Sequence, residues 1–477
     1  MNFVIPLASS AGPLSRQIYQ HLRDAILSGK LPAGERLPST RELAEQLHVS
    51  RTVVLLAYDQ LLAEGYASGR RGAGTYVTTT LNLRVMHPQT ESFHFRLSQY
   101  GKRLAAGPPQ MRDELRRARP LRYDFVYGRS NIDIFPFEAW RRLLLRNARR
   151  APVHELDYGA AAGSPALRQA IAAHLQRSRG VVCDPSQILI VNGSAQAIDL
   201  IIRVLVNPGD SIAVEDPGYQ GARHGLRAAR ARLRPVPVDH DGIIPEKIPA
   251  GTRMVFITPS HQFPTGAVLP LARRLALLDW ARRHRAVIVE DDYDGEFRYG
   301  GQALASLQGL DREGRVLYLG TFSRTVFPAL RIGYLVAPRS LMPALAAAKW
   351  ISDRHTSTLE QQTLAEFLAS GLYERFLRRV RRSNSARRDA LLDAIHAVFG
   401  PAIEVTGQGA GAHIVLWPKT ELDEATIVAR AEHRGVGIYG IAGHYVARRR
   451  RPGIILGFAR LTPAEIREGI SRLHGIF

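Results

Sequence analysis

Side chains able to do chemistry follow strand-like apolar runs in this 477-residue chain. Asp291 and Tyr293 lie in "AVIVEDDYDGEFRY", and Thr321, Arg324 and Arg331 follow the run "RVLYLG". The acidic cluster of the first stretch contains no histidine, and adjacent strand residues point to opposite faces, so only alternate carboxylates can share a ligand. One buried carboxylate that faces a heteroaromatic nitrogen explains this cluster better than a metal, and no metal site is predicted.

Two further runs end in residues suited to a small ligand. After "QILIVNG", Ser194 opens a helical stretch whose first amides are unpaired donors beside a positive dipole end, which suits a phosphate. Many helices begin with Gly-Ser, so this signal is weak by itself. Tyr219 in "EDPGYQG" can stack on a planar ring, although an ordinary loop tyrosine fits equally well. His261 and Gln262 in "TPSHQFPTG" are more typical of structural loop residues than of catalytic ones.

The elements that must position these residues alternate between strands and helices. Five short apolar runs rich in β-branched residues are separated by helical stretches such as 194–206 and 269–284. This pattern predicts an α/β fold, with a mainly parallel sheet covered on both faces. Such sheets carry their ligands at the carboxyl ends of the strands, where the residues above are found.

The first 79 residues have a different pattern. A helical stretch from Ser15 to Ser28 precedes a second helix that Ser39 and Glu42 open as a capping box, and a third helix follows Ser50. The stretch "GYASGRRGAGTYV" predicts a two-stranded hairpin. Three short helices followed by a basic hairpin predict a winged helix-turn-helix domain over residues 1–79.

The DNA-contacting residues of such a domain lie at the start of its third helix and on its hairpin. Ser50, Arg51 and Thr52 occupy the end that reaches base edges in the major groove, where arginine reads guanine best. Arg70 and Arg71 lie between glycines, which would let the hairpin approach phosphates or the minor groove. The competing interpretation is a generic helical bundle with a solvated basic turn.

The overall composition bears on the partner of the protein, its disulfide content and its location. The net charge of +21 suggests an acidic partner such as nucleic acid, but only five of 64 cationic residues are lysine, so an arginine-biased composition explains the charge equally well. Cys183 is the only cysteine, which excludes a disulfide framework within one chain. The sequence has no apolar run long enough for a membrane span and no secretory signal pattern, so we expect a cytoplasmic protein without a membrane partner.

Residues 80–120 predict a basic linker between the two domains. This interval lacks a sustained apolar period and is strongly cationic, which suits a tether that follows a phosphate backbone, with one short helix near 111–118. An ordered arm against the second domain is the alternative. The second domain then spans 121–477, and its smaller C-terminal α+β part starts near 345.

The N-terminal domain resembles the GntR superfamily of regulators. The resemblance runs from Pro13 to Val77 through "GKLPAGERLPSTRELAEQLHVSRTVV" and "GAGTYV". It implies DNA contacts at Arg41, Arg51, Thr52, Arg71 and Gly72.

The remainder resembles fold-type-I, aminotransferase-like proteins that bind pyridoxal phosphate, and the whole chain resembles the MocR-type branch of GntR regulators. Stretches such as "LDYGAAAGSPALRQAIAAHL", "EDPGY", "EDDYDGEFRY" and "YLGTFSRTVFPALRIGYLV" are in family order. The resemblance implies a head-to-tail homodimer that binds operator DNA. It also implies a set of cofactor contacts: the phosphate at Ser194, Ala195, Thr321 and Arg331, the ring face at Tyr219, the ring nitrogen at Asp291 and the ring hydroxyl at Tyr293.

The chain departs from this pattern at Arg324, which occupies the position of the family's Schiff-base lysine. An imine needs a neutral amine, and a guanidinium does not deprotonate in proteins, so no catalytic residue is predicted here. Lys349, 25 positions downstream, is a weak candidate for a replacement. Ile455 stands where an aminotransferase would carry an arginine for the substrate carboxylate.

Three explanations of Arg324 are open: a chance or engineered substitution, non-covalent binding of pyridoxal phosphate, or a different ligand such as another vitamin B6 form. The leading hypothesis is a transcriptional regulator whose second domain senses pyridoxal phosphate or an effector derived from an amino acid or amine. The alternatives are an active aminotransferase with a DNA-binding appendage, and a DNA-binding scaffold with a ligand-free second domain.

Overall fold

The computed structural model describes residues 5–8, 12–70, 73–79, 96–106, 121–153, 156–299, 305–419, 422–447 and 451–477. Two compact units are distinguished, residues 1–96 and 97–477, and each is described by itself.

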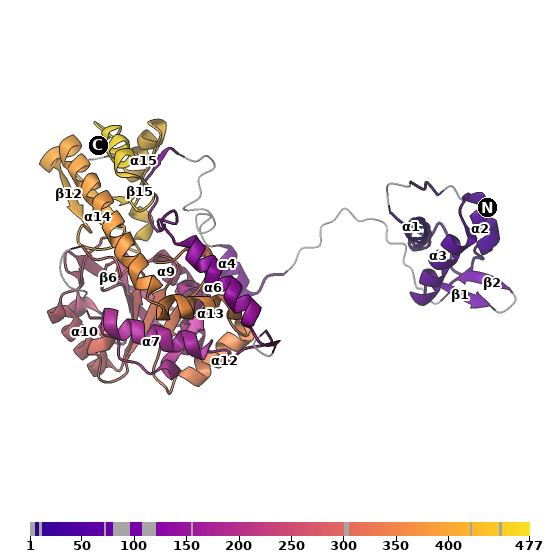
Figure 1. Ribbon diagram of the computed structural model, residues 1–477, viewed down its shortest axis with the longest axis horizontal. Coiled ribbons are helices and arrows are strands. Elements are labelled where there is room, and N and C mark those ends of the chain that lie inside the picture. The colour runs from indigo at the N-terminus through magenta and orange to yellow at the C-terminus, as the bar shows by residue number, and fades with distance from the viewer. Residues whose placement is uncertain are drawn as a thin grey trace. The chain divides into compact units, whose positions relative to one another are not determined.

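The N-terminal unit is a winged helix-turn-helix, as predicted (Figure 1). It comprises α1 (Leu14–Leu27), α2 (Thr40–Gln46), α3 (Arg51–Ala63) and the antiparallel hairpin β1 (Ala67–Arg70) and β2 (Gly74–Val77). The Ser39 hydroxyl accepts from the Glu42 amide and the Glu42 carboxylate accepts from the Ser39 amide, so the predicted capping box is confirmed. Ser50 is the N-cap of α3, but its side chain makes no capping hydrogen bond.

The core of the large unit is an eight-stranded, mostly parallel sheet, which confirms the predicted fold class. In spatial order the strands are β4 (Ile188–Val191), β11 (Gly333–Val336), β10 (Val316–Thr321), β9 (Val287–Asp292), β8 (Met254–Ile257), β5 (Ser211–Asp216), β6 (Arg232–Asp239) and β7 (Gly242–Ile243). The centre of the sheet consists of the parallel strands β10, β9, β8, β5 and β6. Strand β11 runs antiparallel to both β10 and β4, and β7 runs antiparallel to β6.

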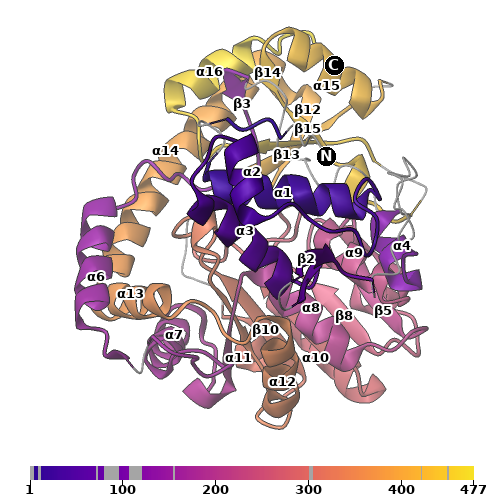
Figure 2. The same cartoon turned by 90° about the vertical axis from the view of Figure 1, so that its right-hand side faces the viewer.

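Helices cover both faces of this sheet (Figures 1 and 2). Alternate strand residues supply the two faces: Leu189 and Val289 pack in one cluster with α8 and α12, whereas Ile190 and Ile288 pack on the opposite face. The first face carries α8 (Ser194–Leu205), α9 (Gln220–Ala228) and α12 (Met342–Asp353). The second carries α6 (Phe137–Arg150), α7 (Pro165–Arg179), α10 (Leu271–His284), α11 (Leu307–Leu310), α13 (Thr358–Ala369) and the start of α14 (Leu372–Phe399).

A smaller α+β part follows along α14. Its antiparallel sheet has the order β12 (Ile403–Thr406), β13 (His413–Pro418), β16 (Ile454–Gly457) and β15 (Tyr439–Gly440). Helices α15 (Glu424–His433) and α16 (Pro463–Ser471) pack with this sheet in one apolar core. The short strand β3 (Tyr123–Asp124) comes from the beginning of the unit and pairs in parallel with β14 (Val436–Gly437).

The described part of the predicted linker contains a helix, α4 (Gln99–Ala105). Arg103 Nε donates to the Ala228 carbonyl at 2.8 Å, so this segment contacts α9 of the large unit, as an ordered arm would. The predicted helix near 111–118 lies outside the described residues.

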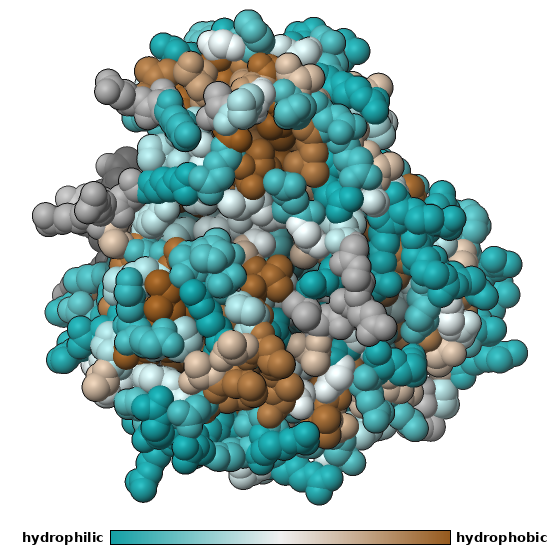
Figure 3. All heavy atoms as spheres, turned by 90° about the vertical axis from the view of Figure 1, so that its left-hand side faces the viewer, coloured by the Kyte–Doolittle hydropathy of each residue, from teal (hydrophilic) through white to brown (hydrophobic). Residues whose placement is uncertain are grey.

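The exterior of the large unit is mainly hydrophilic on the face shown in Figure 3, with separate apolar patches. Among the described residues, no helix combines the length and the apolar composition needed to cross a bilayer.

Candidate functional site

The predicted ligand residues of β9 and β10 lie at one edge of the sheet. These strands are parallel neighbours, and Asp291 pairs in register with Leu319, two residues before Thr321. The segment that follows β10 carries Arg324 and returns through Arg331 into β11. Asp291 therefore lies at the same end of the sheet as Thr321 and the segment that carries Arg324 and Arg331, because parallel strands end at the same edge.

The phosphate side of the site is built around the start of α8. Gly193 caps this helix with φ +84°, and the Gln196 amide makes an early backbone bond back to its carbonyl, so the Ser194 and Ala195 amides precede that bond. Arg331 Nη2 donates to the Asn192 carbonyl at 2.9 Å. A Cβ on Gly193 would lie 2.6 Å from Arg331 Nη2, so only glycine lets the guanidinium approach this turn.

Thr321, the last residue of β10, adds a hydroxyl to the phosphate side of the site. Its hydroxyl donates to Ser323 Oγ at 3.0 Å and accepts from the Ser323 amide at 3.1 Å. A helix N-terminus, an arginine and a hydroxyl-bearing turn form a combination suited to an anion of phosphate size.

Asp291 has a buried carboxylate that is not fully hydrogen-bonded by the described residues. Its side chain is only 4% exposed, and its buried Oδ1 has no hydrogen-bond partner among the described residues. Burial, reinforced by Asp292 and opposed by Arg324, raises the pKa of the Asp291 carboxyl to about 7. An unpaired buried carboxylate is costly, and a protonated ring nitrogen would relieve that cost.

The two tyrosines assigned to the ring lie near one aromatic residue. The ring centroids of Tyr219 and Tyr293 are 6.1 and 5.9 Å from that of Phe263. Tyr219 lies over the start of α9, where a Cβ on Gly221 would be 2.6 Å from its hydroxyl oxygen. The Tyr293 hydroxyl donates to the His261 carbonyl at 3.0 Å, and burial raises its pKa well above the ordinary range.

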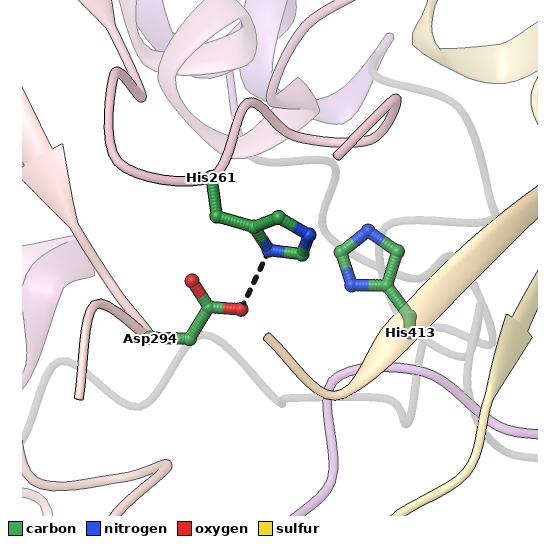
Figure 4. A group of neighbouring side chains, drawn as sticks. All are labelled: His261, Asp294 and His413. Atoms are coloured by element: carbon green, nitrogen blue, oxygen red, sulfur yellow. Dashed lines mark hydrogen bonds and ion pairs between the residues drawn. The ribbon is translucent and has the colours of Figure 1, made fainter. Parts of the chain in front are cut away.

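His261, Asp294 and His413 form a cluster that was not predicted from the sequence (Figure 4). His261 Nδ1 lies 2.9 Å from Asp294 Oδ2 and 3.0 Å from the Tyr293 hydroxyl. Burial lowers the pKa of His413 well below its ordinary value, and its Nε2 lies 3.0 Å from the Pro264 carbonyl. Ligand atoms of the three side chains lie within 4.8 Å of one another, as in a small cation site. Because His261 Nδ1 contacts both the Asp294 carboxylate and the Tyr293 hydroxyl, His261 and Asp294 together help to hold the Tyr293 side chain in place.

Arg324 extends into a small cavity next to the ring side of the site. Tyr293 and Phe263 line this cavity together with the loop from Gly128 to Asn131, Asn384 of α14 and His413 of β13. A Cβ on Gly128, whose φ is +76°, would lie 2.8 Å from Arg324 Nη1, so the guanidinium rests against bare backbone. Among the described residues Arg324 has no hydrogen-bond or ion-pair partner.

Lys349 lies closer to the phosphate side than its sequence position suggested. The side chain is fully buried, and its Nζ contacts Asp353 at 2.8 Å and Gln196 of α8 at 3.3 Å. Burial lowers its pKa, while Asp353 opposes the shift. Lys349 is not among the described residues that line the Arg324 cavity, and its ammonium is engaged in an ion pair.

These residues fit a pyridoxal-type cofactor. The helix start with Arg331 suits its phosphate, and the unpaired Asp291 oxygen suits its ring nitrogen. Arg324 cannot supply the neutral amine that a covalent bond to its aldehyde requires.

The candidate DNA-contacting residues of the N-terminal unit lie on its surface. Arg41, Ser50, Arg51 and Thr52 are accessible at the beginnings of α2 and α3, and Arg51 Nε donates to Thr40 Oγ1 at 3.2 Å. Arg70 is exposed on β1, with its guanidinium 4.8 Å from the centre of the Tyr76 ring. Arg71 and Gly72 lie outside the described residues.

Comparison with known proteins agrees with this architecture. Residues 14–77 match the bacterial regulatory proteins of the gntR family, and residues 95–473 match the aminotransferases of class I and II. The chain is 39% identical to "Probable rhizopine catabolism regulatory protein MocR" of Rhizobium meliloti, over 98% of this chain and 94% of that protein. It is 31% identical to "HTH-type pyridoxine biosynthesis transcriptional regulator PdxR" of Corynebacterium glutamicum, over 95% of each chain.

A solved structure supports the fold of the large unit. LysN, an alpha-aminoadipate aminotransferase of Thermus thermophilus complexed with N-(5'-phosphopyridoxyl)-L-leucine, matches 80% of this chain and 96% of its own, with 28% identity and a TM-score of 0.73. With a GntR domain and an aminotransferase domain joined in one chain, and with full-length similarity to regulators of that build, the chain belongs to the MocR-type branch of the GntR family and is a DNA-binding transcriptional regulator.

Proposed function

We propose that the large unit of this regulator binds pyridoxal phosphate without a covalent bond and senses a small effector derived from an amino acid or amine. The unpaired buried oxygen of Asp291 carries the proposal, because a buried carboxylate beside an anion-binding turn suits the ring and phosphate of one molecule. The name of the similar protein PdxR, which mentions pyridoxine biosynthesis, supports a vitamin B6 ligand.

The chain's own residues would hold this cofactor from three sides. Arg331, Thr321 and the amides of Ser194 and Ala195 would bind its phosphate, and Tyr219 would cover its ring. Asp291 would bind the ring nitrogen, and Tyr293, oriented by His261 and Asp294, would contact the ring hydroxyl. When bound to a lysine this group supplies an electron sink for amino-acid chemistry. Because Arg324 cannot form the bond that a lysine forms, this chain would bind the cofactor without carrying out that chemistry.

Control of operator DNA would follow from differential binding. An effector that binds one arrangement of the chain's units better than another shifts the population toward it, and DNA affinity changes accordingly. The contacts of Arg41, Ser50, Arg51, Thr52, Arg70, Arg71 and Gly72 with DNA are part of this proposal, as is operation in the cytoplasm, where operator DNA lies.

A homodimer is supported by exposed apolar residues near the start of α7 and on α12. Tyr158, Trp350 and Ile351 are 74%, 52% and 75% exposed. The Arg354 guanidinium lies over both aromatic rings, 4.8 Å from the centre of Tyr158 and 4.6 Å from that of Trp350. Clusters of large exposed apolar side chains are typical of interfaces. Trp350→Glu should shift the sedimentation of the full chain toward the monomer, and unchanged sedimentation would count against this interface.

The cofactor proposal is tested by titrating cofactor-free protein with pyridoxal phosphate while calorimetry and visible absorbance are recorded. The natural protein should bind saturably without the yellow imine band, and Arg324→Lys should acquire that band. Arg203→Lys, an exposed change on α8, serves as the matched control. An imine band in the natural protein would show that another lysine forms the bond, and transaminase activity above a no-enzyme blank would favour the aminotransferase alternative. Absence of any binding would favour a ligand-free scaffold.

A further inference from the structure

The cavity beside the ring site contains donors without acceptors. Arg324, Ser130 and Asn131 all line it. Ser130 and Asn131 are only 8% and 4% exposed, and Ser130 Oγ and Asn131 Nδ2 have no hydrogen-bond partner among the described residues. Buried polar groups in native proteins are nearly always paired, so these atoms point to a ligand.

The charge balance of the cavity favours an anion. Arg324 and Arg129 bring two cationic side chains. The only acidic side chain among the described lining residues is Asp294, which is already bonded to His261. A guanidinium offers several N–H donors in one plane and binds a carboxylate through two parallel hydrogen bonds.

The usual source of that recognition is missing from β16. The resemblance to aminotransferases places a carboxylate-binding arginine at Ile455, but this residue is fully buried and packs in an apolar cluster with Phe263 and Tyr127. Any cation that meets an effector in this cavity must therefore come from another element. Arg324 enters from the loop after β10, and the bare backbone of Gly128 makes room for it.

We propose that Arg324, with the Ser130 hydroxyl and the Asn131 amide, forms a carboxylate-binding subsite for the effector. The residue that prevents the covalent bond thus serves to recognise the ligand. Asn384 Oδ1 also lines the cavity and has no hydrogen-bond partner among the described residues, so it can accept from a donor of the same effector. This inference rests on the proposed function, because the effector is taken to lie against the bound ring.

The test uses two unreactive conjugates that differ only in the carboxylate. N-(5′-phosphopyridoxyl)-L-alanine and N-(5′-phosphopyridoxyl)ethylamine are titrated calorimetrically into the full-length, cofactor-free protein. We expect the alanine conjugate to bind at least about tenfold more tightly, as a charge-assisted bidentate contact gives. Arg324→Gln should abolish this difference while changing the ethylamine affinity by less than about twofold, and Arg324→Lys should retain part of it. Asn131→Leu should lower the alanine affinity several-fold, and Arg203→Gln, an exposed change outside the cavity, should leave both affinities unchanged.

Three results would overturn the inference. The two conjugates could bind the natural protein equally, Arg324→Gln could weaken both alike, or pyridoxal phosphate could bind while neither conjugate does. In each of these cases the cofactor site survives and only the carboxylate subsite fails. If neither pyridoxal phosphate nor a conjugate binds the natural protein, the proposed function itself fails, and the subsite fails with it. Binding of pyridoxal phosphate by Arg324→Gln confirms that this variant is folded.

Discussion

The two units of this regulator present their candidate ligand residues in opposite ways. The N-terminal unit displays Arg51 and Arg70 on its surface, whereas the large unit buries Asp291 and half-buries Tyr293 at the carboxyl end of its sheet. Exposed cations attract the phosphate backbone of DNA across a solvent that contains screening ions, so the DNA affinity that they provide depends on the salt concentration. Buried groups are desolvated, so their protonation shifts and their effect depends on pH. The same chain should therefore respond to ionic strength at one end and to proton concentration at the other.

Removing the buried carboxylate should have the largest effect. Asp291→Asn keeps the shape of the side chain but removes the charge that would pair with the ring nitrogen. We expect the affinity for pyridoxal phosphate to fall about a hundredfold, in the range for a desolvated charge pair. Calorimetric titration of the full chain measures this. Asp199→Asn, which changes a partly exposed carboxylate of α8, is the control, and an affinity loss below about threefold in Asp291→Asn would contradict the assignment.

A change on the open surface of α3 should be smaller and should depend on sequence. Arg51→Ala should weaken operator binding roughly 10- to 100-fold, as the loss of one bidentate base contact does. Fluorescence anisotropy with operator and scrambled duplexes at two salt concentrations measures the sequence-specific and the non-specific parts of the binding. Arg16→Ala removes the same charge from α1 and should mainly lower non-specific binding. Equal losses in the two variants would show that Arg51 contacts only phosphate.

The pH dependence of cofactor binding follows from the raised pKa of Asp291. In the free protein its carboxyl titrates at about 7, and a bound ring cation would lower that pKa. Binding below pH 7 must then release a proton, so affinity should fall about tenfold between pH 8 and pH 6 and be nearly flat above pH 8. Titrations at both pH values measure this. An equal fall in Asp291→Asn would assign the effect to the cofactor's own groups.

The smallest effect concerns the two caps of the N-terminal unit. Ser39→Ala removes one half of the capping box and should destabilise α2 by about 1 kcal/mol. Ser50→Ala removes a cap whose side chain makes no such bond and should cost clearly less. Hydrogen exchange of the first-turn amides of α2 and α3 in the full chain compares the two variants. Equal losses of protection would show that the capping hydrogen bond of Ser39 does not stabilise its helix more than Ser50 stabilises α3.

Local patterns carried most of the fold. The capping box at Ser39, the hairpin and the strand–helix alternation depend on neighbours in sequence, so they could be predicted. The insertion of β11 between β4 and β10, antiparallel to both, could not, because it depends on which strand edges are free after the parallel strands have packed.

The sequence by itself determined the residue types at the sheet edge: Asp291, Tyr293, Thr321 and Arg331 follow apolar runs, and Arg324 cannot form an imine. Only the tertiary structure brought His413 and His261 to Asp294, and Ser130 and Asn384 to the cavity wall, because these residues come from segments far apart in the chain. Strand order makes residues at successive strand ends neighbours by a general rule. The packing of a loop, a long helix and a second sheet against the ends of these strands follows no short-range pattern, and this packing brings polar groups that are unpaired among the described residues to the cavity of Arg324.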